Sequence, residues 1–114
     1  MLEVVHGDYT QAPARDVVRS YLQSGKWPDV IFGLNALMTL GALQAMREVG
    51  LSRNDIALFS IDQVHYAEIY GQPIPCISHS SVELGVGAIN LLLGQIDDPS
   101  QPLRDQVIEG QLLL

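Results

Sequence analysis

An unbroken apolar run that leads directly into a helical pattern constrains the fold more than any other feature of the sequence. Residues 29–34 read DVIFGL, without the alternation of a strand that has one polar face, and they predict a strand buried on both faces. Asn35 follows, and Leu37–Val49 are apolar over much of a helical circumference before Gly50, a residue typical of helix ends. A buried strand joined this closely to a helix is half of a βαβ unit.

The rest of the chain continues this alternation. Further strands are predicted at Leu2–Gly7, Asp55–Asp62, residues 75–81 and within residues 105–114. Helices are predicted from Pro13 to Leu22, where apolar residues recur with helical spacing, and from about Ser81 to Leu93, where Ser80 and Glu83 form a capping box. Residues 64–75 are predicted to be irregular or to hold one short helical turn. The pattern indicates a single α/β domain over residues 1–114, built on an open, doubly wound parallel sheet.

Composition narrows the functions that such a domain can have. The 114 residues are 47% hydrophobic and 17% charged, which is typical of one globular domain. The formal net charge of −7 repels phosphate backbones, so we do not expect direct nucleic-acid binding by this chain. No apolar run approaches the roughly 18 residues of a membrane span, and the N-terminus does not resemble a signal peptide. We therefore expect a soluble, cytoplasmic protein with no membrane partner.

Polar or aromatic residues follow four of the predicted strands, and in an open parallel sheet the ligand crevice lies at those strand ends. They are Asp8 and Tyr9, Asn35, Asp62 and Gln63, and Ser78 and His79. Taken singly, Asn35 is equally well explained as a helix N-cap and Asp62 as a turn residue. Their coincidence at four strand ends favours a polar small-molecule site, because a carboxylate, an amide and a ring suit a hydroxyl-rich ligand.

Signals of catalysis or of a cofactor are weak by comparison. The run GVGAIN at Gly85–Asn90 begins like a dinucleotide fingerprint but has Asn90 at the third glycine and falls inside a predicted helix. No phosphate loop or nucleophile elbow is present. The three histidines have no metal-ligand spacing, and the single cysteine, Cys76, excludes an internal disulfide and reads as a small buried residue. We expect no enzyme, no cofactor and no metal site.

Four segments together resemble the lactose-repressor-like (LacI/GalR) transcriptional regulators in order and spacing. They are GDYT, the stretch from Pro28 to Leu51, DIALFSID, and the stretch from Pro73 to Leu92. The most specific motif is Asn–x–x–Met–x–x–Gly–Ala–Leu, which begins at Asn35. The resemblance implies the C-terminal part of a two-lobed effector domain like the periplasmic sugar-binding proteins. It also implies a small-molecule effector: a sugar, a sugar phosphate or a purine.

Matched position by position, the resemblance implies that Tyr9, Asn35, Asp62 and His79 contact effector. The chain departs from the family at four of the neighbouring positions: Ala36 stands where Asp is usual, Ser60 and Ile61 where Gly and an aromatic are usual, and Gln63 where Asp or Asn often follows. One carboxylate is therefore missing from the implied pocket, so its effector is expected to differ or to be absent.

The resemblance begins partway into the C-terminal lobe, so the helix-turn-helix and the N-terminal lobe are expected to be absent. Operator DNA would then be bound only through that missing domain. In the family the helix matching Ser81–Leu93 packs on the N-terminal lobe, and its apolar surface here favours self-association. The family's subunit contact implies a homodimer interface at Leu40, Leu43, Met46, Tyr66 and Tyr70, although the Leu and Met residues could equally be core. The alternative function is a lobe of a periplasmic-type solute-binding protein for transport or sensing; a small α/β enzyme is a more distant alternative.

Overall fold

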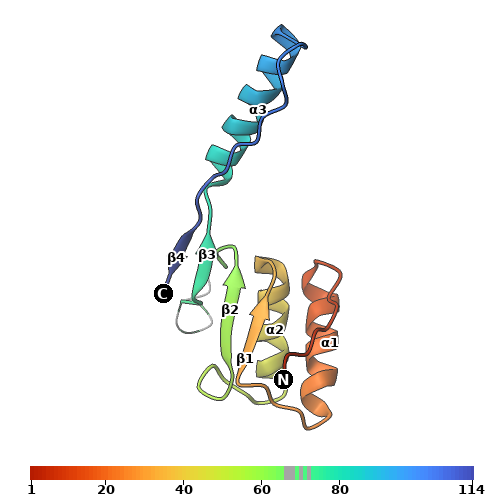
Figure 1. Cartoon of the computed structure of the whole chain (residues 1–114). Helices are drawn as coiled ribbons and strands as arrows, with labels where there is room; N and C mark the ends of the chain where they lie inside the picture. Colours follow the sequence, from red (N-terminus) through yellow and green to blue (C-terminus); the bar gives the residue numbers. More distant parts are fainter. Residues whose placement is uncertain (66–68, 70, 72) are drawn as a thin grey trace.

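The computed structural model describes residues 1–65, 69, 71 and 73–114 (Figure 1). Its elements in chain order are α1 (Gln11–Gln23), β1 (Val30–Gly33), α2 (Ala36–Glu48), β2 (Ala57–Ile61), β3 (Cys76–Ser78), α3 (Ser81–Asp97) and β4 (Gln111–Leu113). The strands form one sheet in the order β1-β2-β3-β4. β1, β2 and β3 are mutually parallel, and β4 pairs antiparallel to β3. The predicted open α/β fold is confirmed, and the expectation of a wholly parallel sheet was wrong for the last strand.

The core lies between the two N-terminal helices and the first two strands. α2 packs on β1 and β2, and α1 packs beside α2 (Figure 1). The core comprises buried residues from both helices and from the strand side: Val18, Leu22, Ala42, Leu43, Ala45, Met46, Ile56, Leu58, Val64 and Ile74. Burial of this much apolar surface stabilises the unit, which consists of α1, β1, α2 and β2 and is called the packed unit below.

The Asn–x–x–Met–x–x–Gly–Ala–Leu motif has a local physical explanation. The Asn35 side chain caps α2 by accepting the backbone N–H of Met38 at 2.7 Å. A Cβ added to Gly41 would lie 2.3 Å from the carbonyl oxygen of Gln11 and 2.8 Å from the amide nitrogen of Arg15. Only glycine therefore allows α1 and α2 to approach so closely. Ala42, which follows, is buried in the core.

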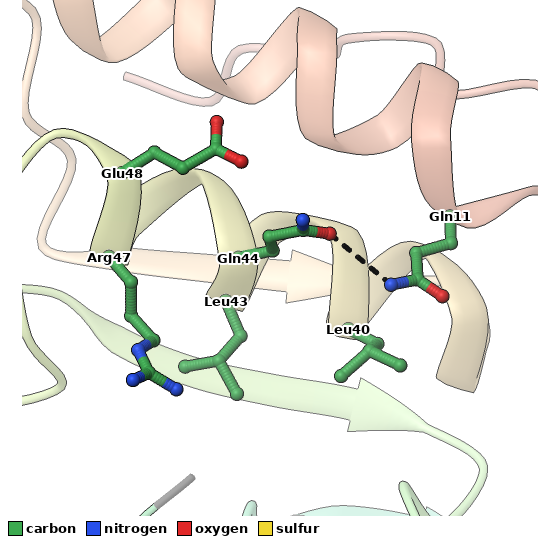
Figure 2. A pocket seen from close by; sticks show the side chains of 6 residues that line it. All are labelled: Gln11, Leu40, Leu43, Gln44, Arg47 and Glu48. Carbon is green, nitrogen blue, oxygen red and sulfur yellow. Dashed lines mark hydrogen bonds between the residues drawn. The ribbon is translucent and has the colours of Figure 1, made fainter.

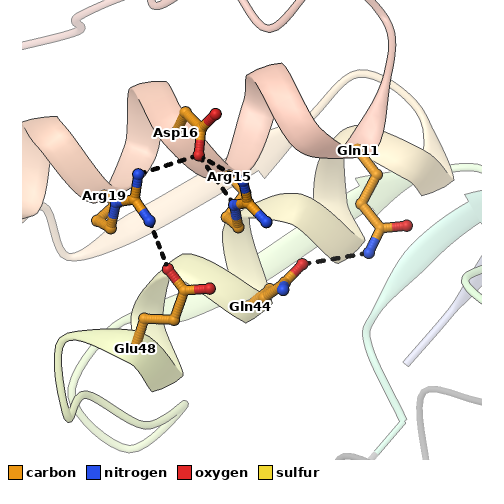
Figure 3. A network of polar contacts seen from close by, with 6 residues as sticks. All are labelled: Gln11, Arg15, Asp16, Arg19, Gln44 and Glu48. Carbon is orange, nitrogen blue, oxygen red and sulfur yellow. Dashed lines mark hydrogen bonds and ion pairs between the residues drawn. The ribbon is translucent and has the colours of Figure 1, made fainter.

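Polar side chains close the solvent side of the contact between α1 and α2. Arg19 bridges Asp16 on its own helix and Glu48 on α2, both at 3.1 Å, and the amide of Gln11 donates to Gln44 at 3.3 Å (Figure 3). All of these groups are partly exposed, and such pairs contribute only about 0–1 kcal/mol each. They orient the two helices, whereas the apolar core supplies most of the stability.

The C-terminal part of the chain extends away from the packed unit. α3 and the segment that returns alongside it to β4, residues 81–110, are called the arm below (Figure 1). The chain measures 58 × 25 × 25 Å as a result. Gly87 is the one buried residue of α3. The apolar side chains of α3 are exposed, namely Val82, Leu84, Val86, Ile89, Leu91, Leu92, Leu93 and Ile96. None of the helices in the described ranges is long and apolar enough to cross a membrane.

Two expectations about the strands were wrong. Residues 29–34 are not buried on both faces, because Val30 and Phe32 are about half exposed, at 53% and 48%. The reason is that α3, which lies between β3 and β4 in the chain, points away from the sheet and leaves the second face uncovered (Figure 1). Leu2–Gly7 forms no strand: β1 pairs only with β2 among the described residues, and an extended segment without ladder hydrogen bonds is not a strand.

Candidate functional site

The carboxyl ends of three neighbouring strands lie along one edge of the sheet. β1, β2 and β3 are parallel and end at Gly33, Ile61 and Ser78. Asn35, Asp62 and His79 follow within two residues of those ends. Since parallel strands bring their carboxyl ends to the same edge, the sequence-predicted residues of these three strands share that edge.

Asn35 serves both as a helix cap and as a link to the segment before α1. Its Oδ1 accepts the N–H of Met38, and its Nδ2 donates to the carbonyl oxygen of Tyr9 at 3.1 Å. The structure therefore brings Tyr9 and Asn35 together, although the contact uses the backbone of Tyr9. The Tyr9 ring is free to meet another molecule, because 73% of the residue's surface is exposed.

Asp62 and His79 form the second contact at this edge. The Nδ1 of His79 lies 3.2 Å from the Oδ1 of Asp62, with both side chains about one third exposed. The backbone N–H of Asp62 donates to the carbonyl of Ile77 at 2.9 Å, which fixes the end of β2 against β3. A partly exposed carboxylate and imidazole in contact offer an acceptor and a donor to a polar ligand.

The backbone at this edge is strained. Asp8, Tyr9 and Asp62 have φ values of 49°, 57° and 70°, and they are the non-glycine residues with positive φ in the described part of the chain. Residues other than glycine rarely adopt this left-handed backbone conformation, and such conformations cluster at functional sites. Each of these three residues comes from the set that the sequence pattern placed at strand ends.

Sequence reasoning missed two buried hydroxyls beneath the site. Thr39 on α2 and Ser60 on β2 are both 0% exposed, and their oxygens lie 2.9 Å apart. Ser60 was noted only as a departure from the family pattern. A signal was present, since a hydroxyl inside an otherwise apolar strand must find a hydrogen-bond partner.

Cys76 does not have the character of a nucleophile. Burial raises the pKa of its thiol, and the Asp62 carboxylate raises that pKa further. The thiol is therefore protonated at neutral pH, whereas a reactive cysteine needs a lowered pKa. The described residues also hold no group of three or more His, Cys, Asp or Glu that could bind a metal ion.

Sequence comparison assigns the chain to a family. The model of the periplasmic binding protein-like domain matches residues 3–113. Similar relatives include the HTH-type transcriptional repressor PurR of Actinobacillus pleuropneumoniae serotype 3, which is 31% identical over 107 residues, 93% of this chain and 32% of the repressor. PurR of Haemophilus influenzae is 32% identical over 94 residues, 82% of this chain and 28% of that protein. The chain is a LacI-type member of the periplasmic binding protein-like domain family. It spans about a third of the length of these curated relatives.

Solved structures agree with this LacI-type assignment. The Lac repressor dimer bound to operator and the anti-inducer ONPF superposes with a TM-score of 0.81 at 25% identity, covering 95% of this chain and 38% of the repressor chain. A LacI family regulator from Enterococcus faecium with bound ribose gives 0.80 at 19% identity, over 93% of this chain and 39% of that one, which shows the fold alone. A regulator from Arthrobacter in complex with lactose gives 0.77 at 25% identity, over 95% and 42%.

The LacI-type interface residues predicted from the sequence divide into three groups. Met46 is 0% exposed and Leu43 is 3% exposed. Both are therefore core residues in this structure, the alternative that the sequence left open. Leu40 is half-buried. Tyr66 and Tyr70 lie outside the described residues. Within the packed unit, Met46 cannot touch a partner subunit without unfolding the core.

A surface pocket lies on the flank of α2. It has a volume of about 490 Å³ and is lined by Gln11 of α1 and by Leu40, Leu43, Gln44, Arg47 and Glu48 of α2. Leu40, Leu43 and Arg47 point away from α1, whereas Glu48 points toward it (Figure 2). The pocket does not contain the strand-end residues, so it is separate from the site above. Its lining combines two leucines with polar and charged side chains.

Proposed function

We propose that this chain is the effector-binding and dimerisation part of a LacI-type transcriptional regulator, and that it is not catalytic. The single observation that carries the proposal is the placement of Asn35, Asp62 and His79 at the carboxyl ends of three adjacent parallel strands. This is where an open α/β sheet binds ligands. The relatives are transcriptional repressors, and one solved neighbour is a repressor dimer bound to operator.

The proposed effector is a small hydroxyl-rich molecule, a sugar or a related compound. Asp62 would accept hydrogen bonds from ligand hydroxyls, Asn35 would orient the segment that carries Tyr9, and the exposed Tyr9 ring would pack on the ligand. The lactose bound in the Arthrobacter regulator supports a sugar. A purine, which the family resemblance also implies, is the alternative effector. Ala36 and Gln63 leave Asp62 as the one carboxylate among residues 35, 36, 62 and 63.

Dimerisation is proposed on two surfaces. Leu40 and Leu43 line the α2 pocket, and the apolar side chains of α3 are exposed, as is common at association surfaces. Operator DNA would be bound by a separate helix-turn-helix domain, because a net charge of −7 opposes DNA binding by this chain. The proposed place of action is the cytoplasm.

A second candidate is the lobe of a solute-binding protein used in transport or sensing. The description of the family model as periplasmic binding protein-like supports it. The reading frame distinguishes the two candidates: an upstream helix-turn-helix favours the regulator, and a signal peptide favours the solute-binding protein.

Asp62→Ala tests the effector site. Isothermal titration with ribose, lactose and a panel of other sugars and purines should show a loss of about 1–3 kcal/mol in binding free energy, because a buried ligand hydroxyl loses its acceptor. Asp105→Ala, a change of the same type at an exposed position in the arm, should bind like the parent. Equal affinity in Asp62→Ala and the parent would remove Asp62 from the site.

Self-association is tested by sedimentation velocity over a range of protein concentrations. The parent chain should show a dimer or larger species whose proportion rises with concentration. Leu92→Glu places a charge on the exposed apolar surface of α3 and should shift the equilibrium toward monomer. A monodisperse monomer at all concentrations contradicts the proposal.

A further inference from the structure

Thr39 and Ser60 form a buried hydroxyl pair that lies between the two halves of the strand-end site. Thr39 belongs to the first turn of α2 and Ser60 is the next-to-last residue of β2. Both are fully buried, and their side-chain oxygens are 2.9 Å apart. The Thr39 hydroxyl also reaches the carbonyl oxygen of Asn35, and the Ser60 hydroxyl reaches that of Ile61, both at 2.8 Å. The pair therefore contacts the backbone of Asn35, a site residue, and the backbone of Ile61, which precedes the site residue Asp62.

The two hydroxyl protons limit how the three contacts of the pair can be made. Each hydroxyl has a single proton, so two protons serve three contacts. The Asn35 carbonyl already accepts the backbone N–H of Thr39 at 3.1 Å. Either hydroxyl can donate across the pair; when Thr39 donates to Ser60, Ser60 still donates to the Ile61 carbonyl, and the Asn35 carbonyl keeps the Thr39 N–H as a donor. The opposite direction takes the hydroxyl donor away from the Ile61 carbonyl.

The Ser60 hydroxyl restrains the peptide group that sets the direction of Asp62. The carbonyl of Ile61 and the N–H of Asp62 belong to one planar unit. Ser60 holds the carbonyl side, and the Asp62 N–H donates to Ile77 on β3 at 2.9 Å. Fixing this plane from both sides restrains the ψ of Ile61 and the φ of Asp62. That φ is 70°, a value that needs such restraint.

Gly33 provides the space that the pair occupies. A Cβ at this position would lie 2.0 Å from the Thr39 hydroxyl oxygen. Three buried positions on β1, α2 and β2 are therefore mutually adjusted: a residue without a side chain, and two hydroxyls of matching reach. A pair that served only to fill space would need no polar atoms, and burying hydroxyls is unfavourable unless they are hydrogen-bonded.

We infer that Thr39 and Ser60 are positioning residues of the effector site, which hold Asp62 in its strained conformation and tie it to the N-terminus of α2 at Asn35. The inference rests on the proposed function only in calling the site an effector site. Neither side chain reaches solvent, so both act through the residues that a ligand meets. Their role is to orient the Asp62 carboxylate before a ligand arrives, which lowers the ordering that binding requires.

Amide hydrogen exchange of the full chain, followed by NMR without ligand, tests the inference. Ser60→Ala should speed exchange of the Asp62 N–H roughly five- to tenfold, the factor that loss of one net hydrogen bond implies. The exchange rates of the Ala45 and Met46 amides, deep in α2, should change equally and by far less than the rate of the Asp62 amide. A purely structural role would instead accelerate Asp62 and the α2 amides by the same factor, and that result overturns the inference.

Thr39 offers a matched pair of variants. Thr39→Val removes the hydroxyl and keeps the shape, whereas Thr39→Ser keeps the hydroxyl. Thr39→Val should accelerate the Asp62 amide and Thr39→Ser should not; equal effects overturn the inference. If Ser60→Ala does not fold, this pair decides alone. Titration with ribose and lactose is a separate readout: a failure to bind them counts against the proposed function, while the exchange result still decides the positioning role.

Discussion

The packed unit and the arm are both rich in apolar residues, but only the packed unit buries them. α2 buries six residues, Thr39, Gly41, Ala42, Leu43, Ala45 and Met46, because α1 lies on one side of it and the sheet on the other. α3 is the longer helix, yet Gly87 is its one buried residue. Apolar content therefore predicts which surface needs cover, whereas burial depends on a neighbouring element at the right distance.

Truncating one apolar side chain in each region should give the largest difference in stability between the packed unit and the arm. Met46→Ala should lower the free energy of unfolding by about 2–5 kcal/mol, because it leaves a cavity in the core. Leu92→Ala on α3, where the side chain is half exposed, should change it by less than about 0.5 kcal/mol in the monomer. Urea denaturation of both variants gives the two free energies of unfolding. Similar losses in the two variants would show that α3 is packed as tightly as α2.

Replacing a glycine with alanine should lower stability in α2 and raise it in α3. Gly41→Ala inserts a Cβ against the backbone of α1 and should destabilise the packed unit by about 1–3 kcal/mol. A Cβ at Gly85 meets nothing within 4 Å, so Gly85→Ala should stabilise α3 by roughly 0.5–1 kcal/mol through helix propensity. Circular dichroism during urea titration measures the first, and amide exchange in α3 measures the second. Destabilisation of α3 by Gly85→Ala would mean that the arm is packed against something.

A smaller effect should appear at acidic pH. The Ser52 hydroxyl, and then the Ser52 backbone N–H, lower the pKa of Asp55. A carboxyl whose pKa is lower in the folded state stabilises the fold above its unfolded pKa of about 3.9, and this contribution is lost as the pH falls through the folded value. Asp55→Asn should therefore make the urea midpoint less dependent on pH below about 4.

Asp98 provides the matched control in the arm. Its pKa is lowered in the same way by Ser100, so the two carboxyls differ mainly in their location. Asp98→Asn should leave the pH dependence of the packed unit unchanged, since the arm does not contribute to that core. A change as large as that of Asp55→Asn would show that the arm and the packed unit unfold together.

Much of the fold could be predicted because its signals are local. The helical spacing of Ala14, Val18 and Leu22 and the cap at Asn35 are properties of neighbouring residues, and all of these positions behave as expected. Non-local pairing could not be predicted. Leu2–Gly7 has the residues of a strand but pairs with no strand in the described part of the chain. β4 runs antiparallel because the arm reverses the chain before it returns to β3.

The candidate site shows the same division. Strand-end position was enough to place Asn35, Asp62 and His79 along one edge, because chain order and parallel pairing determine that geometry. The Thr39–Ser60 pair could not be predicted, since those residues are 21 positions apart and meet only when α2 packs on β2. Met46 was predicted at an interface through resemblance, although its helical position directs it into the core.

We propose that the site rests on a packed unit that is stable by itself, whereas α3 needs a partner surface. Amide hydrogen exchange across the whole chain, measured at low and at high protein concentration, tests it most directly. We expect strong protection in α1, α2, β1 and β2 at both concentrations, and protection in α3 that is weak at low concentration and rises with association. Equal protection of α3 and α2 in the dilute monomer would contradict it.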